Sequence, residues 1–247
     1  MTLDSEHACV IDLDGVVWLA DEPLRGAAEG VALLRDAGVP VLFVTNNSAP
    51  TVGQLLDRLV SAGIAARGDE VVTSGLSAAA LVGDDQRVLV VGAAGLLEAL
   101  DERGATVVHA EPDCVVVGWT DLFDYDTCDR AARAIRAGAR FIATNLDPTF
   151  PMPTGLRPGT GAIVAAVATA AECEPLVAGK PSPAMRDLVL SRSGVGAVIG
   201  DRKTTDGAFA EALGVPFAHV ASAVERGAAG DPGTYLSLLD AARHLLA

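Results

Sequence analysis

Two carboxylates, Asp12 and Asp14, stand at the end of an apolar run near the start of the chain. The run Cys9-Val-Ile-Asp-Leu-Asp-Gly15 is rich in β-branched residues, and its glycine is typical of the end of a strand. Side chains two positions apart on a strand point to the same side, so we expect the two acids to lie close together. Close carboxylates repel and usually share a cation or a proton. The pair therefore indicates a metal or acid–base site, with a polar Asp-Gly exit from the strand as the alternative.

Three later segments also place polar side chains just after buried runs. They are Thr45-Asn46, Lys180, and Asp201 with Asp206. In an open parallel sheet, ligands bind outside the carboxyl ends of the strands, so we expect the four segments to converge. Each segment alone has a simpler interpretation: a helix N-cap at Thr45-Asn46, a solvated lysine, or a surface ion pair beside Asp201. The site hypothesis is favoured because it needs all four segments, and all four occur.

Apolar runs alternate with helical patterns almost throughout the chain, which is typical of βαβ units and a parallel sheet. The alternation restarts near Arg87, and this second block has enough apolar sequence to bury a core of its own. We therefore predict an α/β fold with a Rossmann-like parallel-sheet core domain at 1–79 and 179–247 and an inserted α/β domain at 80–178. Within it, 139–161 is expected to be a long functional loop. A closing helix is expected over 234–246.

The composition excludes several classes of partner. The net charge of −14, from 18 basic and 32 acidic residues, argues against nucleic acid and against anionic membranes. Four scattered cysteines without CxxC spacing argue against zinc and disulfides and favour a reducing, cytoplasmic location. We expect no signal peptide, and no apolar run reaches the roughly 18 residues of a membrane span. The four histidines show no ligand or triad spacing and are interpreted as bystanders.

Taken together, the polar motifs resemble those of haloacid-dehalogenase-like (HAD) hydrolases. Within that superfamily the chain is similar to the subfamily of NagD, p-nitrophenyl phosphatase and phosphoglycolate phosphatase, which carries a large α/β (C2-type) cap. The resemblance covers essentially the whole chain. The matching segments are Asp12-Leu-Asp14-Gly15-Val16, Thr45-Asn46-Asn47, Phe141-Ile-Ala-Thr-Asn145-Leu-Asp147-Pro148-Thr149-Phe150-Pro151, Gly179-Lys180-Pro181-Ser182-Pro183 and Gly200-Asp201-Arg202-Lys203-Thr204-Thr205-Asp206.

The resemblance implies a Mg²⁺-dependent phosphoric monoester hydrolase acting on a small phosphorylated metabolite. Asp12 would be the nucleophile that forms a phosphoaspartyl intermediate. Asp14 would protonate the leaving alkoxide, activate the attacking water, and give its backbone carbonyl to the metal. Asp12 and Asp201 would supply carboxylates to Mg²⁺, a hard cation that prefers oxygen ligands. Lys180 would hold the nucleophile and the phosphoryl oxygens by its positive charge.

The same resemblance assigns supporting roles. The Thr45 hydroxyl and the Asn46 backbone N–H would bind phosphate oxygens. Asp206 is expected behind the metal ligands, holding a metal-bound water or the catalytic lysine. In the inserted domain, the best candidates for contact with substrate are Asn145 and Asp147, because their loop matches the subfamily.

Other functions use the same residue types. A phosphotransferase or mutase would share the whole site, and only the acceptor of the phosphoryl group would differ. A phospho-accepting regulatory module is disfavoured, because such receivers are about half this length and lack an insert. The sequence leaves open which metabolite is the substrate: glycerol phosphate, phosphoglycolate, a nucleotide, a sugar phosphate or pyridoxal phosphate. A homodimer is compatible with the resemblance, because caps of this subfamily can mediate dimers.

Overall fold

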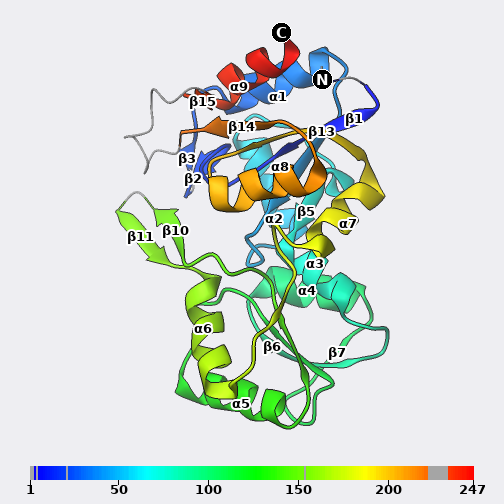
Figure 1. Ribbon diagram of the computed structural model, residues 1–247, viewed down its shortest axis with the longest axis vertical. Helices are drawn as coiled ribbons and strands as arrows, with labels where there is room; N and C mark the ends of the chain where they lie inside the picture. The colour runs from blue at the N-terminus through cyan, green and yellow to red at the C-terminus, as the bar shows by residue number, and fades with distance from the viewer. Residues whose placement is uncertain (1–2, 4, 21, 153, 222–232) are drawn as a thin grey trace.

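Two separate parallel sheets form the framework of the computed structural model, which describes residues 3, 5–20, 22–152, 154–221 and 233–247 (Figure 1). The first sheet has the order β15-β14-β13-β1-β4-β5. Its strands are β1 (His7–Ile11), β4 (Val41–Thr45), β5 (Val71–Thr73), β13 (Gly194–Gly200), β14 (Phe217–Val220) and β15 (Thr234–Tyr235). Strands β1, β4 and β5 of this sheet come from the start of the chain, and β13, β14 and β15 come from its last quarter. The chain therefore leaves this sheet after β5 and returns to it at β13.

Helices cover both faces of the first sheet, as the alternation of strands and helices predicts. In β1, Cys9 and Ile11 face one apolar cluster, whereas Ala8 and Val10 face another. The first cluster is covered by α1 (Ala27–Asp36), α2 (Val52–Ser61) and α9 (Leu238–Leu246), and the second by α7 (Pro183–Arg192) and α8 (Ala208–Leu213). A strand buried on both faces cannot shift its register without moving side chains across the sheet, which fixes the position of the acids that follow it.

The second sheet has the order β12-β9-β8-β6-β7 and lies in the lower lobe of Figure 1. Its strands are β6 (Arg87–Val91), β7 (Thr106–Val107), β8 (Cys114–Val117), β9 (Arg140–Ala143) and β12 (Leu176–Val177). The covering helices are α3 (Ser74–Leu81) and α4 (Ala94–Glu102) on one face, and α5 (Tyr125–Arg136) and α6 (Thr160–Ala171) on the other. The α/β fold class is thereby confirmed. The division into a core domain and an inserted domain stays a prediction, and α3 runs across the predicted boundary at 79/80.

Two expectations about local structure are wrong. The stretch 139–161 is not a plain loop, because it holds an antiparallel hairpin of β10 (Thr149–Met152) and β11 (Gly155–Pro158). The closing helix starts only at Leu238, because Thr234 and Tyr235 pair with β14 and Ser237 then caps α9. A further short hairpin was not predicted. Its strands, β2 (Trp18–Leu19) and β3 (Glu22–Pro23), have two residues each and pair antiparallel. None of the described helices is both long and apolar enough to cross a bilayer.

Candidate active site

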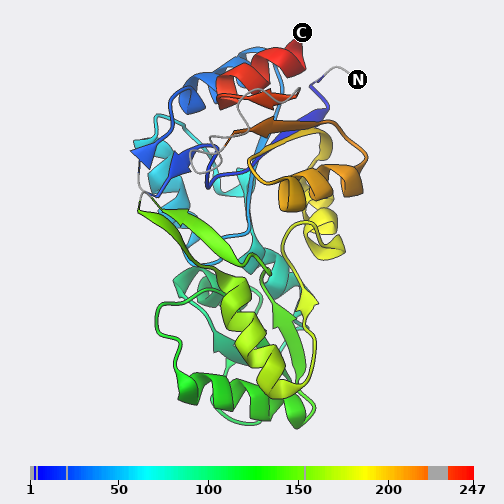
Figure 2. The ribbon, with the colours of Figure 1, turned by 60° about the vertical axis from the view of Figure 1, so that its left-hand side comes forward.

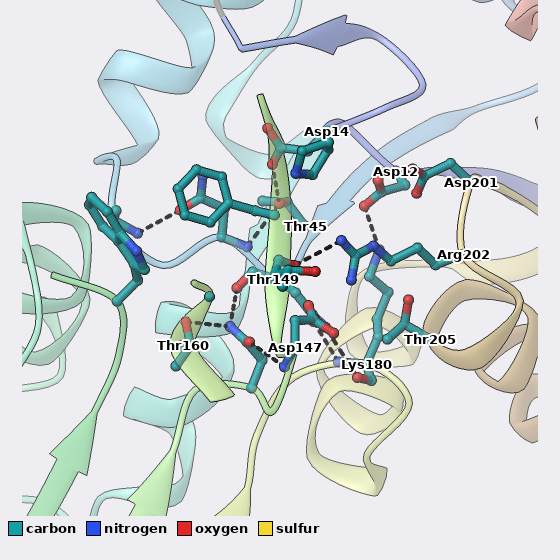
Figure 3. Close-up of a pocket in the computed structure, with 18 of the residues that line it drawn as sticks. Asp12, Asp14, Thr45, Asp147, Thr149, Thr160, Lys180, Asp201, Arg202 and Thr205 are labelled. Atoms are coloured by element: carbon teal, nitrogen blue, oxygen red, sulfur yellow. Dashed lines mark hydrogen bonds and ion pairs between the residues drawn. The ribbon is translucent and has the colours of Figure 1, made fainter. Parts of the chain in front are cut away.

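Lys180 lies at the centre of the site, buried under the carboxyl ends of β1 and β4. Its Nζ donates to Asp12 Oδ1 at 2.6 Å, to Asp206 Oδ1 at 2.6 Å and to the Val44 carbonyl at 2.8 Å. Only 4 % of Lys180 is exposed, so the solvated-lysine interpretation is wrong. All three protons of the ammonium group are therefore used, and the amine can occupy only one position. Figure 3 shows Lys180 reaching from its loop toward Asp12.

The charge around this lysine is not balanced. Oxygens of Asp12, Asp201 and Asp206 all lie within 4.8 Å of one another, and all three residues are buried. Burial raises the pKa of Asp12 well above its usual range, opposed by Lys180 and reinforced by the neighbouring acids. Burial and then Asp206 raise the pKa of Asp201 to about 7. Burial alone would lower the pKa of Lys180, but Asp12 and Asp206 outweigh burial and raise it.

This charge pattern fits a divalent cation. One ammonium group cannot neutralise three buried carboxylates, so they must hold protons or share a further positive charge. The donors are all carboxylate oxygens, the type that Mg²⁺ prefers. The backbone turn keeps this space open: Gly15 has φ +93°, and a Cβ there would collide with the Asp201 carboxylate. The residues present therefore suit a hard, oxygen-binding metal ion.

Asp14 lies beside this cluster, where two side chains orient it. Trp18 Nε1 donates to Asp14 Oδ1 at 3.0 Å, and Thr45 Oγ1 lies 3.5 Å from Asp14 Oδ2, at the limit of a hydrogen bond. Its charge still raises the pKa of Asp12, so the two acids are electrostatic neighbours, as their spacing predicts. The Asp14 carboxyl thus faces the pocket with a fixed orientation and one oxygen weakly engaged.

The loop after β4 does not cap the helix that follows it. Helix α2 is capped by Thr51 instead, through a capping box with Gln54. The Thr45 hydroxyl accepts from the Asn47 N–H at 3.0 Å and lines the pocket. Asn46 pairs with the main chain of Lys180: its Nδ2 donates to the Lys180 carbonyl at 3.2 Å and its Oδ1 accepts from the Lys180 N–H at 2.8 Å. This pair of bonds fixes the lysine loop against the loop after β4.

Asn145 and Asp147 bring the inserted lobe to the same place. Asn145 Nδ2 donates to the Asn46 carbonyl at 2.6 Å and to Thr160 Oγ1 at 3.2 Å, and only 3 % of the residue is exposed. Asn46 Nδ2 also donates to Asp147 Oδ2 at 3.0 Å. Burial raises the pKa of Asp147, opposed by the hydrogen bond from Asn46. Both residues line the pocket, and both also tie the two lobes together.

A pocket of about 410 Å³ joins all these groups. The pocket includes every residue predicted from the sequence, from Asp12 and Asp14 to Asp201 and Asp206. The second lobe adds Trp119 and the hairpin residue Phe150, whose rings meet edge to face at 5.7 Å. Asp12, Lys180, Asp201 and Asp206 are buried at this junction, and removal from water strengthens the electrostatic interactions among them.

Two residues that support the site are not predicted from the sequence. His219 was interpreted as a bystander, but its Nε2 lies 2.9 Å from the Asp201 carbonyl and its Nδ1 lies 3.1 Å from Thr234 Oγ1. Arg202 donates from its guanidinium to the Thr149 carbonyl at 2.8 Å, which connects the Asp201 loop to the hairpin (Figure 3). His219 belongs to no motif, and Arg202 lies in the Asp201 motif without a role assigned to it there, so only the neighbouring strand and the hairpin reveal their contacts.

Two family models match segments of this chain. A family model described as haloacid dehalogenase-like hydrolase matches residues 9–106, and a HAD-hydrolase-like model matches residues 177–237. The chain is 39 % identical over 231 residues to D-glycerol 3-phosphate phosphatase of Mycobacterium tuberculosis, covering 87 % of this chain but only 63 % of that relative.

Two solved structures extend the comparison to the fold. A magnesium complex of glycerol phosphate phosphatase from M. tuberculosis matches with a TM-score of 0.85 and 35 % identity, over 96 % of this chain and 76 % of the other. A p-nitrophenyl phosphatase from Archaeoglobus fulgidus matches with a TM-score of 0.88 and 30 % identity, over 97 % and 99 % of the two chains.

Proposed function

Because this chain belongs to the haloacid dehalogenase-like hydrolase family, we propose that it is a phosphatase that uses Mg²⁺ to release phosphate from a small phosphorylated metabolite. The observation that carries the proposal is the convergence on Asp12, where a buried ammonium group lies 2.6 Å from one carboxylate oxygen and two further carboxylates lie close by. A cluster with this charge can bind a metal ion and a phosphoryl group together.

In the first half of the reaction, an Asp12 carboxylate oxygen attacks phosphorus and the bond to the leaving oxygen breaks. Asp14 gives its proton to that leaving oxygen, so the alcohol departs neutral. The orientation of Asp14 by Trp18 supports this role. In the second half, Asp14 takes a proton from water, the water oxygen attacks phosphorus, and the Asp12–phosphorus bond breaks. Two easier displacements replace one difficult step.

Asp12 and Asp201, with the Asp14 backbone carbonyl, would hold Mg²⁺. When bound, the ion neutralises the carboxylates and the phosphoryl oxygens so that one anion can approach another. Asp206 is proposed to position Lys180, because its Oδ1 accepts from the ammonium group and its Oδ2 accepts from the Arg202 N–H at 3.1 Å. Lys180, the Thr45 hydroxyl and the Asn46 N–H would bind phosphoryl oxygens.

The inserted lobe is proposed to act as a cap that excludes water and contacts the leaving group. Asp147 suits contact with a leaving-group hydroxyl, because its carboxylate lines the pocket and, among the described residues, hydrogen bonds reach only its Oδ2. Asn145 suits a role at the junction, because its amide already binds Asn46 and Thr160. A homodimer and a cytoplasmic location stay predictions.

The test is release of phosphate from p-nitrophenyl phosphate. We expect turnover with Mg²⁺, none with excess chelator, and a loss of at least about 10³-fold in Asp12→Asn. Asp57→Asn, an exposed aspartate on α2, is the matched control and should keep full activity. Retained activity in Asp12→Asn would refute the assigned nucleophile. If the phosphoryl group is transferred to a sugar in preference to water, the protein is a mutase and not a phosphatase.

A further inference from the structure

The β10–β11 hairpin lines one side of the pocket. It extends from the second lobe toward the first (Figures 1 and 2). Phe150 and Arg157 are directly opposite each other in its ladder, so their side chains share one face. The Arg157 guanidinium carbon lies 5.9 Å from the centre of the Phe150 ring, and both residues line the pocket. The hairpin therefore presents a guanidinium group on an aromatic platform.

Arg157 differs from many other arginines of this acidic protein. Elsewhere arginines pair with carboxylates, as Arg35 does with Glu70 at 3.1 Å and Arg133 with Asp129 at 2.7 Å. In the described part of the chain, no carboxylate forms an ion pair with Arg157, which is exposed and contacts Phe150. A guanidinium group held over a pocket without a carboxylate partner is available to a ligand.

Charge is divided along the pocket. The acids that line it come from the catalytic loops and from Asp147, and the described hairpin residues contribute none. A second guanidinium group lines the pocket from α2, where Arg58 is held over the Trp18 ring at 4.3 Å. The net charge of −14 repels any anionic substrate at long range. The Arg157 guanidinium offsets that repulsion locally at the hairpin, whereas Arg58 is already engaged with Trp18 and with the Ala20 carbonyl.

We propose that the leaving group of the preferred substrate carries a second anionic group, which Arg157 binds at the outer end of the pocket. This inference rests on the proposed phosphatase function and narrows its substrates to phosphomonoesters with a further carboxylate or phosphate. The transferred phosphoryl group occupies the catalytic end, and the body of the leaving group lies along Phe150 and Trp119. Arg157 is thus a specificity-determining residue, and the planar guanidinium can bind either anion through two hydrogen bonds.

The experiment compares esters that differ only in the second charge. 3-Phosphoglycerate and glycerol 3-phosphate differ by a carboxylate in place of a hydroxymethyl group, and fructose 1,6-bisphosphate and fructose 6-phosphate differ by one phosphate. We expect kcat/KM to be about tenfold higher for the member with the additional carboxylate or phosphate in at least one pair, and the pair that shows it identifies the anion. Because Arg157 is exposed, the preference should weaken in about 0.5 M salt.

The variant Arg157→Gln should remove this preference. We expect kcat/KM for the favoured anionic ester to fall about tenfold, with Arg157→Lys intermediate. Hydrolysis of p-nitrophenyl phosphate, which lacks a second anion, should fall by clearly less than hydrolysis of the favoured ester, so the ratio of the two kcat/KM values should drop. Arg130 is an exposed arginine of α5 in the same lobe, and Arg130→Gln is the matched control. It should change neither kcat/KM for the favoured ester nor kcat/KM for p-nitrophenyl phosphate.

Binding to the Asp12→Asn protein, measured by calorimetry with Mg²⁺, gives the same comparison without turnover. The inference is overturned if, in both pairs, the ester with the additional carboxylate or phosphate binds no more tightly than its partner without that group. An anionic preference that survives Arg157→Gln overturns the role of this residue. Absence of p-nitrophenyl phosphate hydrolysis by the unmodified protein would instead count against the phosphatase proposal, and the binding comparison would still decide the specificity.

Discussion

Replacing Lys180 by Met should destabilise the metal-free protein by an amount that the geometry allows us to work out. At 2.6 Å and an effective dielectric constant of about 20, each ion pair of Lys180 contributes roughly 6 kcal/mol of attraction. Desolvation of the buried charges offsets most of this. Removing one partner of a buried pair then typically costs about 3–5 kcal/mol, because the remaining charge is left uncompensated. For a domain of this size, that corresponds to a fall in Tm of roughly 6–20 °C.

The assay is thermal unfolding at pH 8 in chelator and again in Mg²⁺. The loss in Tm should be smaller with Mg²⁺, because the ion would neutralise the carboxylates that the lysine no longer does. The double variant Lys180→Met with Asp206→Asn should recover part of the stability, because it removes one of the uncompensated charges. Lys203→Met, which changes the chain's other lysine at an exposed position, is the control.

Two results would refute this reasoning. A Tm of Lys180→Met within about 2 °C of the unmodified protein in chelator would mean that the buried pairs contribute little. A double variant no more stable than Lys180→Met would mean that uncompensated negative charge is not the cause of the loss. Phosphatase activity should fall by about 10²–10³-fold in Lys180→Met and in the double variant, as expected when a group that stabilises the transition state is removed.

Three further predictions concern pH, backbone and thiols. The folded pKa of Asp201, about 7, exceeds its ordinary value of 3.8, so its contribution to metal-free stability is lost as pH rises toward and through 7. Mg²⁺ must displace that proton, so the increase in Tm on adding Mg²⁺ should grow from pH 6 to pH 8, and a flat profile would contradict this assignment. Gly15→Ala should weaken Mg²⁺ binding at least about tenfold, measured by calorimetry, because φ is +93° and the new Cβ would displace the Asp201 carboxylate. Cys173 is exposed and should react with a thiol reagent in the native protein; Cys9, whose pKa burial raises to about 12, should react only after unfolding, and rapid labelling of Cys9 would show that β1 opens.

Sequence alone was enough for the catalytic end of the pocket. Acids and a lysine at the ends of β-branched runs predict convergence, because parallel strands expose their carboxyl ends at one edge of the sheet. The structure places Asp12 and Asp201 at that edge of the first sheet, whereas Lys180 follows β12 of the second sheet and reaches Asp12 from its loop. The second core was also predictable, because a separate alternation of apolar runs must bury itself somewhere.

Only the tertiary structure decided the outer end of the pocket. The hairpin residues carry no periodic signal strong enough to separate a short ladder from a Pro- and Gly-rich loop, so the pairing of Phe150 with Arg157 was not predictable. The contact of His219 with the Asp201 carbonyl likewise depends on β14 lying beside β13. Motifs that must converge for chemistry are local in sequence and can be recognised there. The side chains that line the outer end of the pocket come together only through the packing of two lobes, and no spacing in the sequence gives the distances between them.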